Sequence, residues 1–311
     1  MDADYDVIIV GGGPAGLSAA LMLGRCRRRV LVLDSGRYRN YATEAMHGFM
    51  TRDGTPPSEI RRVAREELMR YDIEVRCATA TTSRKDGDRF RVDLDHGDPC
   101  TSRKLVLATG VIDELPPIDG IDRFYGKSVH HCPYCDAWEH RDQPMAVYGK
   151  GRKGVGLSMS LKTWTADVVL CTDGPAGPST DERAKLRDLG IEIRPGRIAA
   201  LEGEGSDLRR ILFADGSAIE RRAIFFTTGQ KQHCDLGLSF GCDLTQKGVM
   251  KTDRWERTSV PGLYAVGDCS RNVQWVIVAA AEGAIAAEAI NMELQEEDRN
   301  AFLAARREER A

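Results

Sequence analysis

The stretch YDVIIVGGGPAG, residues 5–16, decides the fold. Its first six residues are an apolar run of strand length, and the glycines lead into a helix of small residues over 17–24. A second apolar run, Val30–Leu33, ends in Asp34. Strand, glycine-rich turn, helix and second strand make a βαβ unit whose turn lets the phosphates of a dinucleotide approach the backbone.

Each part of this turn has an expected role. Gly11 allows the tight turn, Gly13 lets a pyrophosphate come close, and Gly16 lets the helix pack against the strand. Asp34, about 20 residues further on, is placed to bind a ribose hydroxyl. The residues expected beside the pyrophosphate are Gly11, Gly13, Pro14, Ala15 and Gly16. The alternative is a glycine-rich turn that only joins a strand to a helix.

A second βαβ unit begins at Met145–Tyr148 and continues through the turn GKGRKG, residues 149–154. Its second strand ends in CTDG, residues 171–174, where an NADP site usually has arginines for the 2′-phosphate. The next arginine is Arg183, although Arg152 and Lys153 in the turn can partly substitute. Two readings stay open: a working pyridine-nucleotide site, or a domain that kept its fold and lost its nucleotide.

The stretch HHCPYCD, residues 130–136, lies directly ahead of this second unit. Pro133 suits the first position of a helix, which places Cys132 at the helix start, where the dipole stabilises a thiolate. Cys132 is therefore the expected attacking sulfur of a redox-active disulfide with Cys135. Asp136 can exchange a proton with a thiol if burial raises its pKa.

Two other interpretations of the cysteine pair are open. Half of a zinc site requires a second pair at short spacing, and Cys234 and Cys242 are too widely separated for that role. No metal is therefore expected. The pair can also be buried and inert. The other seven cysteines are expected to be packing residues.

Length and charge limit the classes of function. A chain of 311 residues accommodates two domains, and a net charge of −3 with mixed signs argues against nucleic acid or a membrane surface as partner. The scattered cysteines and the absence of a signal-peptide pattern favour the cytoplasm. The apolar run 276–281 is far shorter than the roughly 20 residues that span a bilayer.

Two later motifs complete the pattern. The strand that ends near Leu107 runs into Ala108-Thr109-Gly110, and a strand at 262–266 ends in Gly267-Asp268. A long helix is expected over 275–294, followed by a charged tail, 295–311, that is a solvated helix or a frayed end. Residues 236–247, rich in glycine and polar side chains, are interpreted as a linker.

In this order, the motifs resemble those of the low-molecular-weight thioredoxin reductases over nearly the whole chain. The resemblance implies an α/β fold of two Rossmann-like domains, the second inserted into the first. The FAD-binding domain would comprise residues 1–115 and 244–311, and an NAD(P)-binding-like domain, 116–243, would carry the disulfide. It also implies a homodimer in which the second domain swivels.

The resemblance further implies roles for single residues. Asp34 would bind the adenosine ribose of FAD and Asp268 its ribityl-pyrophosphate region, while Cys135 would face the flavin and Cys132 would exchange with substrate. The further residues expected at the FAD are Thr109, Gly110, Gly267, Gln274, Trp275 and Val276.

Departures from the reductases point to a related group. Gln274-Trp275 replaces the Arg-Gln of the reductases, and Cys-Pro-Tyr-Cys replaces Cys-Ala-Thr-Cys. The latter is similar to the dithiol oxidases that form the disulfides of gliotoxin, holomycin and romidepsin, in which oxygen takes the electrons. Several of those enzymes carry His where this chain has Asp136. His130 and His131 can act as bases for an incoming thiol, one of them being expected to be structural.

Three hypotheses follow for the function. The leading one is an FAD-dependent thiol–disulfide oxidoreductase that oxidises a small-molecule dithiol. The second is a reductase of a thioredoxin-like protein that uses NADP or NAD in reduced form. The third is a flavin redox sensor whose disulfide state changes a partner surface.

Overall fold

The computed structural model describes residues 3–175 and 177–310. The chain forms two compact units: a first unit of Met1–Arg39, Ser58–Ile112 and Lys231–Ala311, and a second unit of Asn40–Pro57 and Asp113–Gln230. Within the described residues, none of the helices combines the length and the apolar character that a membrane span requires.

The first unit is a seven-stranded sheet with the order β3-β2-β1-β6-β5-β4, in which β17 pairs with the second half of β6. The pairs that involve β1, β2, β3 and β17 are parallel, and the β4-β5-β6 pairs are antiparallel. Its strands are β1 (Tyr5–Val10), β2 (Val30–Leu33), β3 (Ile73–Arg76), β4 (Ala80–Asp86), β5 (Arg89–Leu94), β6 (Cys100–Leu107) and β17 (Leu263–Ala265). The carboxyl ends of β1, β2, β6 and β17 therefore meet at one edge of the sheet, where ligands bind in such folds.

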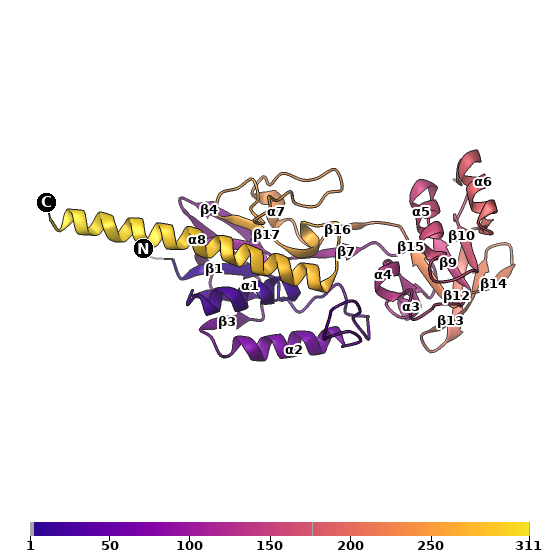
Figure 1. Ribbon diagram of the computed structural model, residues 1–311, viewed down its shortest axis with the longest axis horizontal. Coiled ribbons are helices and arrows are strands. Elements are labelled where there is room, and N and C mark those ends of the chain that lie inside the picture. The colour runs from indigo at the N-terminus through magenta and orange to yellow at the C-terminus, as the bar shows by residue number, and fades with distance from the viewer. Residues whose placement is uncertain (1–2, 176, 311) are drawn as a thin grey trace. The chain divides into compact units, whose positions relative to one another are not determined.

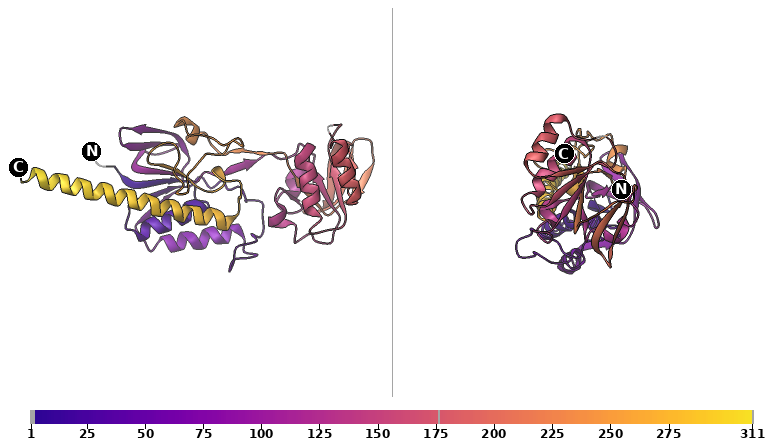
Figure 2. Two further views of the ribbon diagram at one scale, coloured as in Figure 1. Left: turned by 45° about the horizontal axis from the view of Figure 1, so that its top comes forward. Right: turned by 90° about the vertical axis from the view of Figure 1, so that its right-hand side faces the viewer.

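Helices α1 and α8 pack against each other on this sheet (Figures 1 and 2). The helices of this unit are α1 (Pro14–Arg25), α2 (Pro57–Leu68), α7 (Leu236–Ser239) and α8 (Val276–Glu308), with a 3₁₀ turn at Gly267–Cys269. One apolar cluster lies between the sheet and the α1 and α8 helices, and a second lies on the other face of the sheet. The first unit thus has a core of its own.

The second unit is a five-stranded parallel sheet, β11-β10-β9-β15-β8, with an antiparallel sheet β12-β13-β14. Its strands are β8 (Val129–His130), β9 (Met145–Tyr148), β10 (Val168–Cys171), β11 (Glu192–Arg194), β12 (Ile198–Glu204), β13 (Asp207–Phe213), β14 (Ala218–Glu220) and β15 (Ala223–Phe226). Its helices are α3 (Ile121–Phe124), α4 (Pro133–Asp136), α5 (Gly151–Leu161) and α6 (Thr180–Asp188). Two further apolar clusters form its core.

Two short strands, β7 (Val111–Asp113) and β16 (Gln230–Gln232), pair with each other where the chain passes from one unit to the other. The insertion of one α/β unit into another agrees with the expected fold class.

The borders of the units differ from those expected at 115/116 and 243/244. Residues 231–243 belong to the first unit because Leu236 and Cys242 are buried in its apolar cluster, so the segment is no free linker. Residues 40–57 belong to the second unit, where Tyr41 packs on Tyr125 with ring centroids 6.3 Å apart. Long-range packing decides both assignments.

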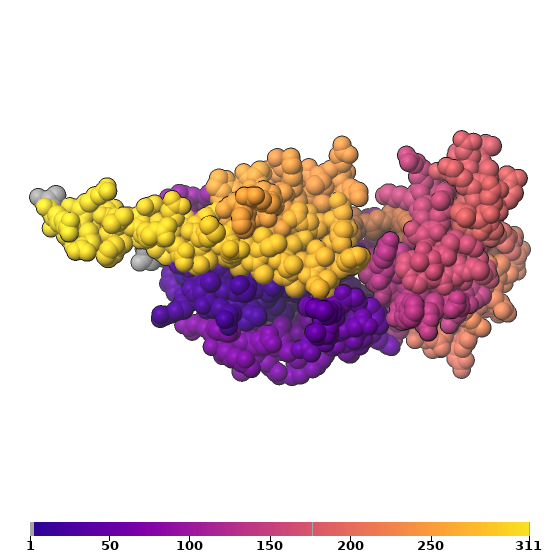
Figure 3. Space-filling view, viewed as in Figure 1, coloured from indigo at the N-terminus to yellow at the C-terminus, as the bar shows by residue number. Residues whose placement is uncertain are grey.

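Helix α8 continues well beyond the expected end at 294. It runs to Glu308, so the charged tail is helical, and residues 300–308 are all exposed. Figure 3 shows this last part of α8 extending past the body of the first unit. Ala311 lies outside the described residues. Ion pairs such as Arg28–Asp298 at 2.6 Å hold the start of the tail.

Candidate functional site: two glycine turns and a disulfide

The first glycine turn has no room for side chains where the chain must turn tightly. A Cβ on Gly11, whose φ is +117°, would lie 2.2 Å from the carbonyl oxygen of Ala108 at the end of β6. A Cβ on Gly16 would lie 1.9 Å from the carbonyl oxygen of Gly11. Around Gly13, by contrast, there is open space within 4 Å. This is the cradle that a pyrophosphate needs at the start of a helix.

Asp34 follows β2 directly and lies against the turn. Its carboxylate accepts hydrogen bonds from the backbone N–H of Gly36 at 2.9 Å and the hydroxyl of Tyr38 at 2.6 Å, and Arg65 also contacts it. A Cβ on Gly12 would lie 2.1 Å from its Oδ2, so the carboxylate is held next to the glycines. Tyr38 and Arg65 were not identified from the sequence, because both reach Asp34 through tertiary packing.

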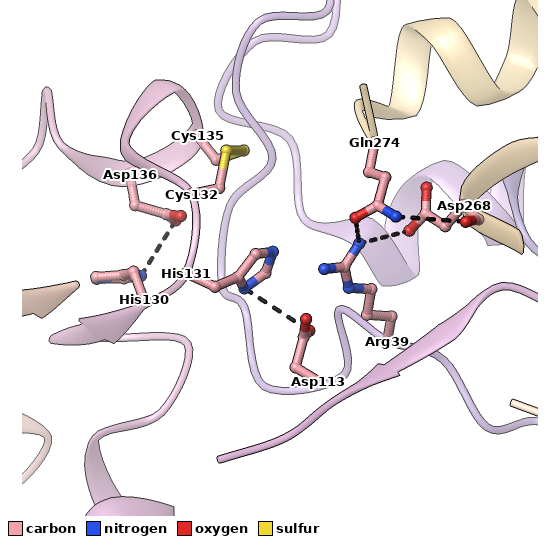
Figure 4. The surroundings of a disulfide bond; sticks show 9 residues. All are labelled: Arg39, Asp113, His130, His131, Cys132, Cys135, Asp136, Asp268 and Gln274. Carbon is pink, nitrogen blue, oxygen red and sulfur yellow. Dashed lines mark hydrogen bonds and ion pairs between the residues drawn. A yellow bond between two sulfur atoms is a disulfide. The ribbon is translucent and has the colours of Figure 1, made fainter. Parts of the chain in front are cut away.

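Asp268 and Gln274 come together through a residue that the sequence analysis missed, Arg39. Its Nη1 donates to Asp268 Oδ2 at 2.8 Å and to Gln274 Oε1 at 2.6 Å (Figure 4). Gln274 Nε2 in turn donates to the backbone carbonyl of Asp268 at 3.3 Å. Arg39 follows β2 by a few residues, and no pattern in the sequence marks it. Trp275, partly exposed, is the N-cap of α8, and Val276 is its first residue.

The Gly267-Asp268 turn is fixed by a buried charge cluster. Gly267 lies against Ala15 of the first turn, and its N–H donates to Glu282 Oε2 at 2.7 Å. Arg271 donates from Nε to Glu282 at 2.8 Å and from Nη2 to both carboxylate oxygens of Glu256. Burial raises the pKa of Glu282 to about 7 and also raises the pKa of Glu256. The guanidinium of Arg271 thus pairs with two buried carboxylates.

Thr109 and Gly110 follow β6 at the same sheet edge. Gly110 has a φ of +67° and open space around it, which agrees with close approach of a ligand. Cys269 lies next to this turn, fully buried, with its thiol donating to the carbonyl oxygens of Leu107 and Val266. Burial raises the pKa of Cys269 to about 12, so this thiol stays protonated.

In the second unit, Cys132 and Cys135 form a disulfide with a Cα–Cα distance of 5.3 Å. Pro133 is the first residue of α4 and Cys132 is its N-cap, as the sequence predicts. Both cysteines are partly exposed. Of the other seven, Cys26 and Cys77 are exposed, so the expectation that all of them pack in the interior is wrong for these two.

Asp136 lies at the end of α4 and pairs with His130, whose Nδ1 is 3.4 Å from Asp136 Oδ1 (Figure 4). Burial raises the pKa of Asp136, but His130, His131 and His140 outweigh it, so that the pKa is lowered. The condition set for this proton exchange, a pKa raised by burial, is therefore not met, because the sequence showed neither the burial of Asp136 nor the imidazoles around it.

The two expected histidines differ in surroundings. His130 is 5% exposed, and its Nε2 lies 3.1 Å from Nε2 of His140, a residue that the sequence analysis did not single out. His131 is more open, and its Nδ1 lies 3.7 Å from Asp113 Oδ2. The hydroxyl of Tyr125 donates to the same oxygen of Asp113 at 3.0 Å. Each histidine thus has a carboxylate partner.

The second glycine turn packs as the first one does. A Cβ on Gly149 would lie 2.8 Å from Gly154 Cα, and Gly151 has open space around it. The end of β10 is different. Thr172 occupies the position of Asp34, because Thr172 N donates to Arg194 O as Asp34 N donates to Arg76 O. The second unit therefore has a threonine where the first unit has the carboxylate of Asp34.

A comparison with protein families matches residues 5–283 to the pyridine nucleotide-disulphide oxidoreductases. The chain belongs to the pyridine nucleotide-disulphide oxidoreductase family. It is 33% identical to a "Probable thioredoxin reductase" of Arthroderma benhamiae, over 98% of this chain and 84% of that protein. It is 30% identical to thioredoxin reductase tcpT of Claviceps purpurea, over 93% of this chain and 94% of that protein.

Among solved structures, HlmI superposes with a TM-score of 0.94 at 35% identity, covering 98% of this chain and 97% of that chain. The predictions of a thioredoxin reductase-like disulfide oxidoreductase and of two Rossmann-like domains are thereby confirmed. The pyridine nucleotide-disulphide oxidoreductases are enzymes that use FAD and NAD(P)H. The open space at Gly13, with Asp34 beside the turn, fits the pyrophosphate and ribose of FAD.

Proposed function

We propose that this enzyme oxidises a small-molecule dithiol to a disulfide through Cys132 and Cys135, with oxygen as the final electron acceptor. Bound FAD would take the electron pair from the protein dithiol. The residues that would hold it are those of the first glycine turn, Asp34, Thr109, Gly110, Gly267 and Asp268. Arg39 is added to that group because it fixes Asp268 and Gln274.

One observation carries the choice of an oxidase. At the end of β10, where a nicotinamide nucleotide needs an acid or a basic cluster, Thr172 donates its hydroxyl to the carbonyl of Gly174. Asp173 is engaged as well: Tyr148 donates to its Oδ2 at 2.9 Å and the Ile198 N–H to its Oδ1 at 3.0 Å. These side chains do not fit an adenosine ribose or a 2′-phosphate, which favours dithiols over a nicotinamide nucleotide as the source of electrons.

The protein's own residues suit the thiol chemistry. The substrate thiol would attack Cys132, and Cys135 would leave as a thiolate. Asp136, whose pKa is lowered, is ionised near neutral pH and can accept the proton of the substrate thiol. His131 directly precedes Cys132 in the chain, and its Nδ1 faces the carboxylate of Asp113. It would act as a base for an incoming thiol.

The second candidate is a reductase of thioredoxin-like proteins, which the names of the relatives favour. The two can be separated with the FAD-loaded enzyme under anaerobic conditions. We expect dithiothreitol to bleach the flavin absorbance and air to restore it, while NADPH and NADH at the same concentration act far more slowly. Rapid bleaching by either nucleotide would contradict the oxidase assignment and support the reductase.

Cysteine variants provide the control for that experiment. Cys135→Ser should keep its FAD spectrum but lose bleaching by dithiols, because no pair of protein thiols can form. Cys100→Ser removes a buried cysteine of the first unit that has no part in the proposed exchange and should leave bleaching unchanged. Full activity of Cys135→Ser would remove the disulfide from the mechanism.

A further inference from the structure

Beside the disulfide, the second unit brings together three groups that exchange protons. Asp136 ends α4, His130 ends β8, and His140 lies in the turn that follows α4. His130 stands between the other two, with Nδ1 3.4 Å from Asp136 Oδ1 and Nε2 3.1 Å from His140 Nε2. His130 is almost fully buried, whereas His140 is only half-buried. The buried His130 thus links a partly buried carboxylate to a half-buried imidazole.

Three polar atoms meet between the two imidazoles. The carbonyl oxygen of Lys127 lies 3.0 Å from Nε2 of His130 and 3.2 Å from Nε2 of His140. An N–H of either imidazole can donate to this carbonyl or to the other imidazole, since the two nitrogens are 3.1 Å apart. A proton can therefore pass between His130 and His140 when one nitrogen carries the hydrogen and the other accepts it.

The charge state of His140 follows from its surroundings. Burial and the charge of His130 lower the pKa of His140 to about 4, although the Lys127 carbonyl, Asp136 and Asp207 act in the opposite direction. His140 is therefore neutral near pH 7. The other ring nitrogen of His130, Nδ1, faces Asp136 and can donate to its carboxylate. The ring of Phe225, with its centroid 5.4 Å away, packs on His130.

We propose that Asp136, His130 and His140 form a proton relay for thiol–disulfide exchange at Cys132–Cys135, with His130 as the residue that positions Asp136. This inference rests on the proposed function. His130 and His140 would move protons to and from Asp136, and neither would contact a thiol directly.

The exchange moves two electrons from the substrate dithiol to the protein disulfide. The substrate sulfur bonds to Cys132 while the Cys132–Cys135 bond breaks, and its electron pair stays on Cys135. The proton of the substrate thiol passes to Asp136, and the relay returns a proton to Cys135. The second substrate thiol then attacks the mixed disulfide and releases Cys132, which takes the second proton. In sum, a substrate dithiol and the protein disulfide give a substrate disulfide and a protein dithiol.

The test measures exchange by its product. FAD-loaded enzyme is mixed anaerobically with dithiothreitol at pH values from 3 to 9 and quenched with acid. The oxidised dithiothreitol formed in the first turnover is then quantified by chromatography. His130→Gln keeps an amide donor for Asp136 but cannot take up a proton. We expect its rate at pH 7 to fall about tenfold or more, because the variant loses part of the roughly 10²–10⁴-fold that general acid–base catalysis contributes.

The pH profile distinguishes a relay from a merely structural role. His130 lowers the pKa of Asp136, together with His131 and His140, so the acid limb of the profile should move to higher pH in His130→Gln. His140→Gln should show a smaller fall in rate. The matched control is His96→Gln, because His96 is an exposed histidine of the first unit that pairs with Asp95. We expect this control to behave as the wild type does.

The outcomes separate this inference from the proposed function. A wild-type enzyme that forms no oxidised dithiothreitol would overturn the proposed function and the relay with it. A wild-type enzyme that forms it, with His130→Gln equal in rate and in pH profile, would overturn the relay alone. Thermal unfolding of each variant shows whether a lost rate comes from a lost fold; a misfolded His130→Gln is replaced by His130→Asn, for which the same results are expected.

Discussion

At the scale of single residues, the most heavily charged part of the FAD-site framework is Arg271 between Glu256 and Glu282. Both carboxylates are almost fully buried, and both have raised pKa values because burial disfavours their charge. Such a cluster tolerates the loss of a charge poorly, since the remaining partners stay buried without compensation. Glu282 of this cluster also accepts a hydrogen bond from the N–H of Gly267. Loss of the cluster would therefore also disturb the Gly267-Asp268 turn, which is expected to bind FAD.

Arg271→Met should therefore destabilise the protein by about 3 kcal/mol or more at pH 8. The pKa values of the two carboxyl groups are higher in the folded protein than in the unfolded chain. At pH values between the unfolded and the folded pKa, the folded protein therefore binds more protons than the unfolded chain. Protonation thus favours folding as pH falls, and the loss should be smaller at pH 5. Urea unfolding at both pH values measures this. A loss that is equal at the two values would contradict the charge argument.

At the scale of elements, the crossing of α1 and α8 depends on a glycine. A Cβ on Gly283 would lie 2.1 Å from the carbonyl oxygen of Ala15, which belongs to the first turn of α1. The two helices can approach this closely only because residue 283 has no side chain. The same contact joins α8 to the glycine turn that is expected to hold the pyrophosphate of FAD.

We expect Gly283→Ala to destabilise the protein by about 1–3 kcal/mol, as overpacking a close contact does, and to weaken FAD binding. Gly156 is the matched control: it lies within α5 with no atom within 4 Å of its Cβ position. Gly156→Ala should stabilise the protein by about 0.5–1 kcal/mol, because alanine favours the helix. Thermal unfolding and flavin titration measure both variants. Equal behaviour of the two would show that α1 and α8 are not in close contact.

At the scale of the whole molecule, the chain contains two units that each have their own apolar clusters. The residues that fit FAD all belong to the first unit, and the disulfide with its relay belongs to the second. A ligand that binds only one folded unit stabilises that unit by mass action.

Removal of FAD should therefore act on the two units unequally. With FAD at 100 times its dissociation constant, we expect backbone amides of β1, β2 and β6 to exchange about 100-fold more slowly than in the cofactor-free protein. Amides of β9, β10 and β15 should change little. Hydrogen–deuterium exchange with mass spectrometry measures this. A uniform change over both units would mean that they unfold as one.

The sequence by itself determined the two βαβ units, the glycine turns, Cys132 at the start of α4 and the family, because these features depend on residues close together in the chain. Only the tertiary structure decided that Arg39 joins Asp268 to Gln274, that His140 stands behind His130, that histidines lower the pKa of Asp136, and that 40–57 belongs to the second unit. The physical reason is that these depend on contacts which folding brings together and which no local spacing encodes.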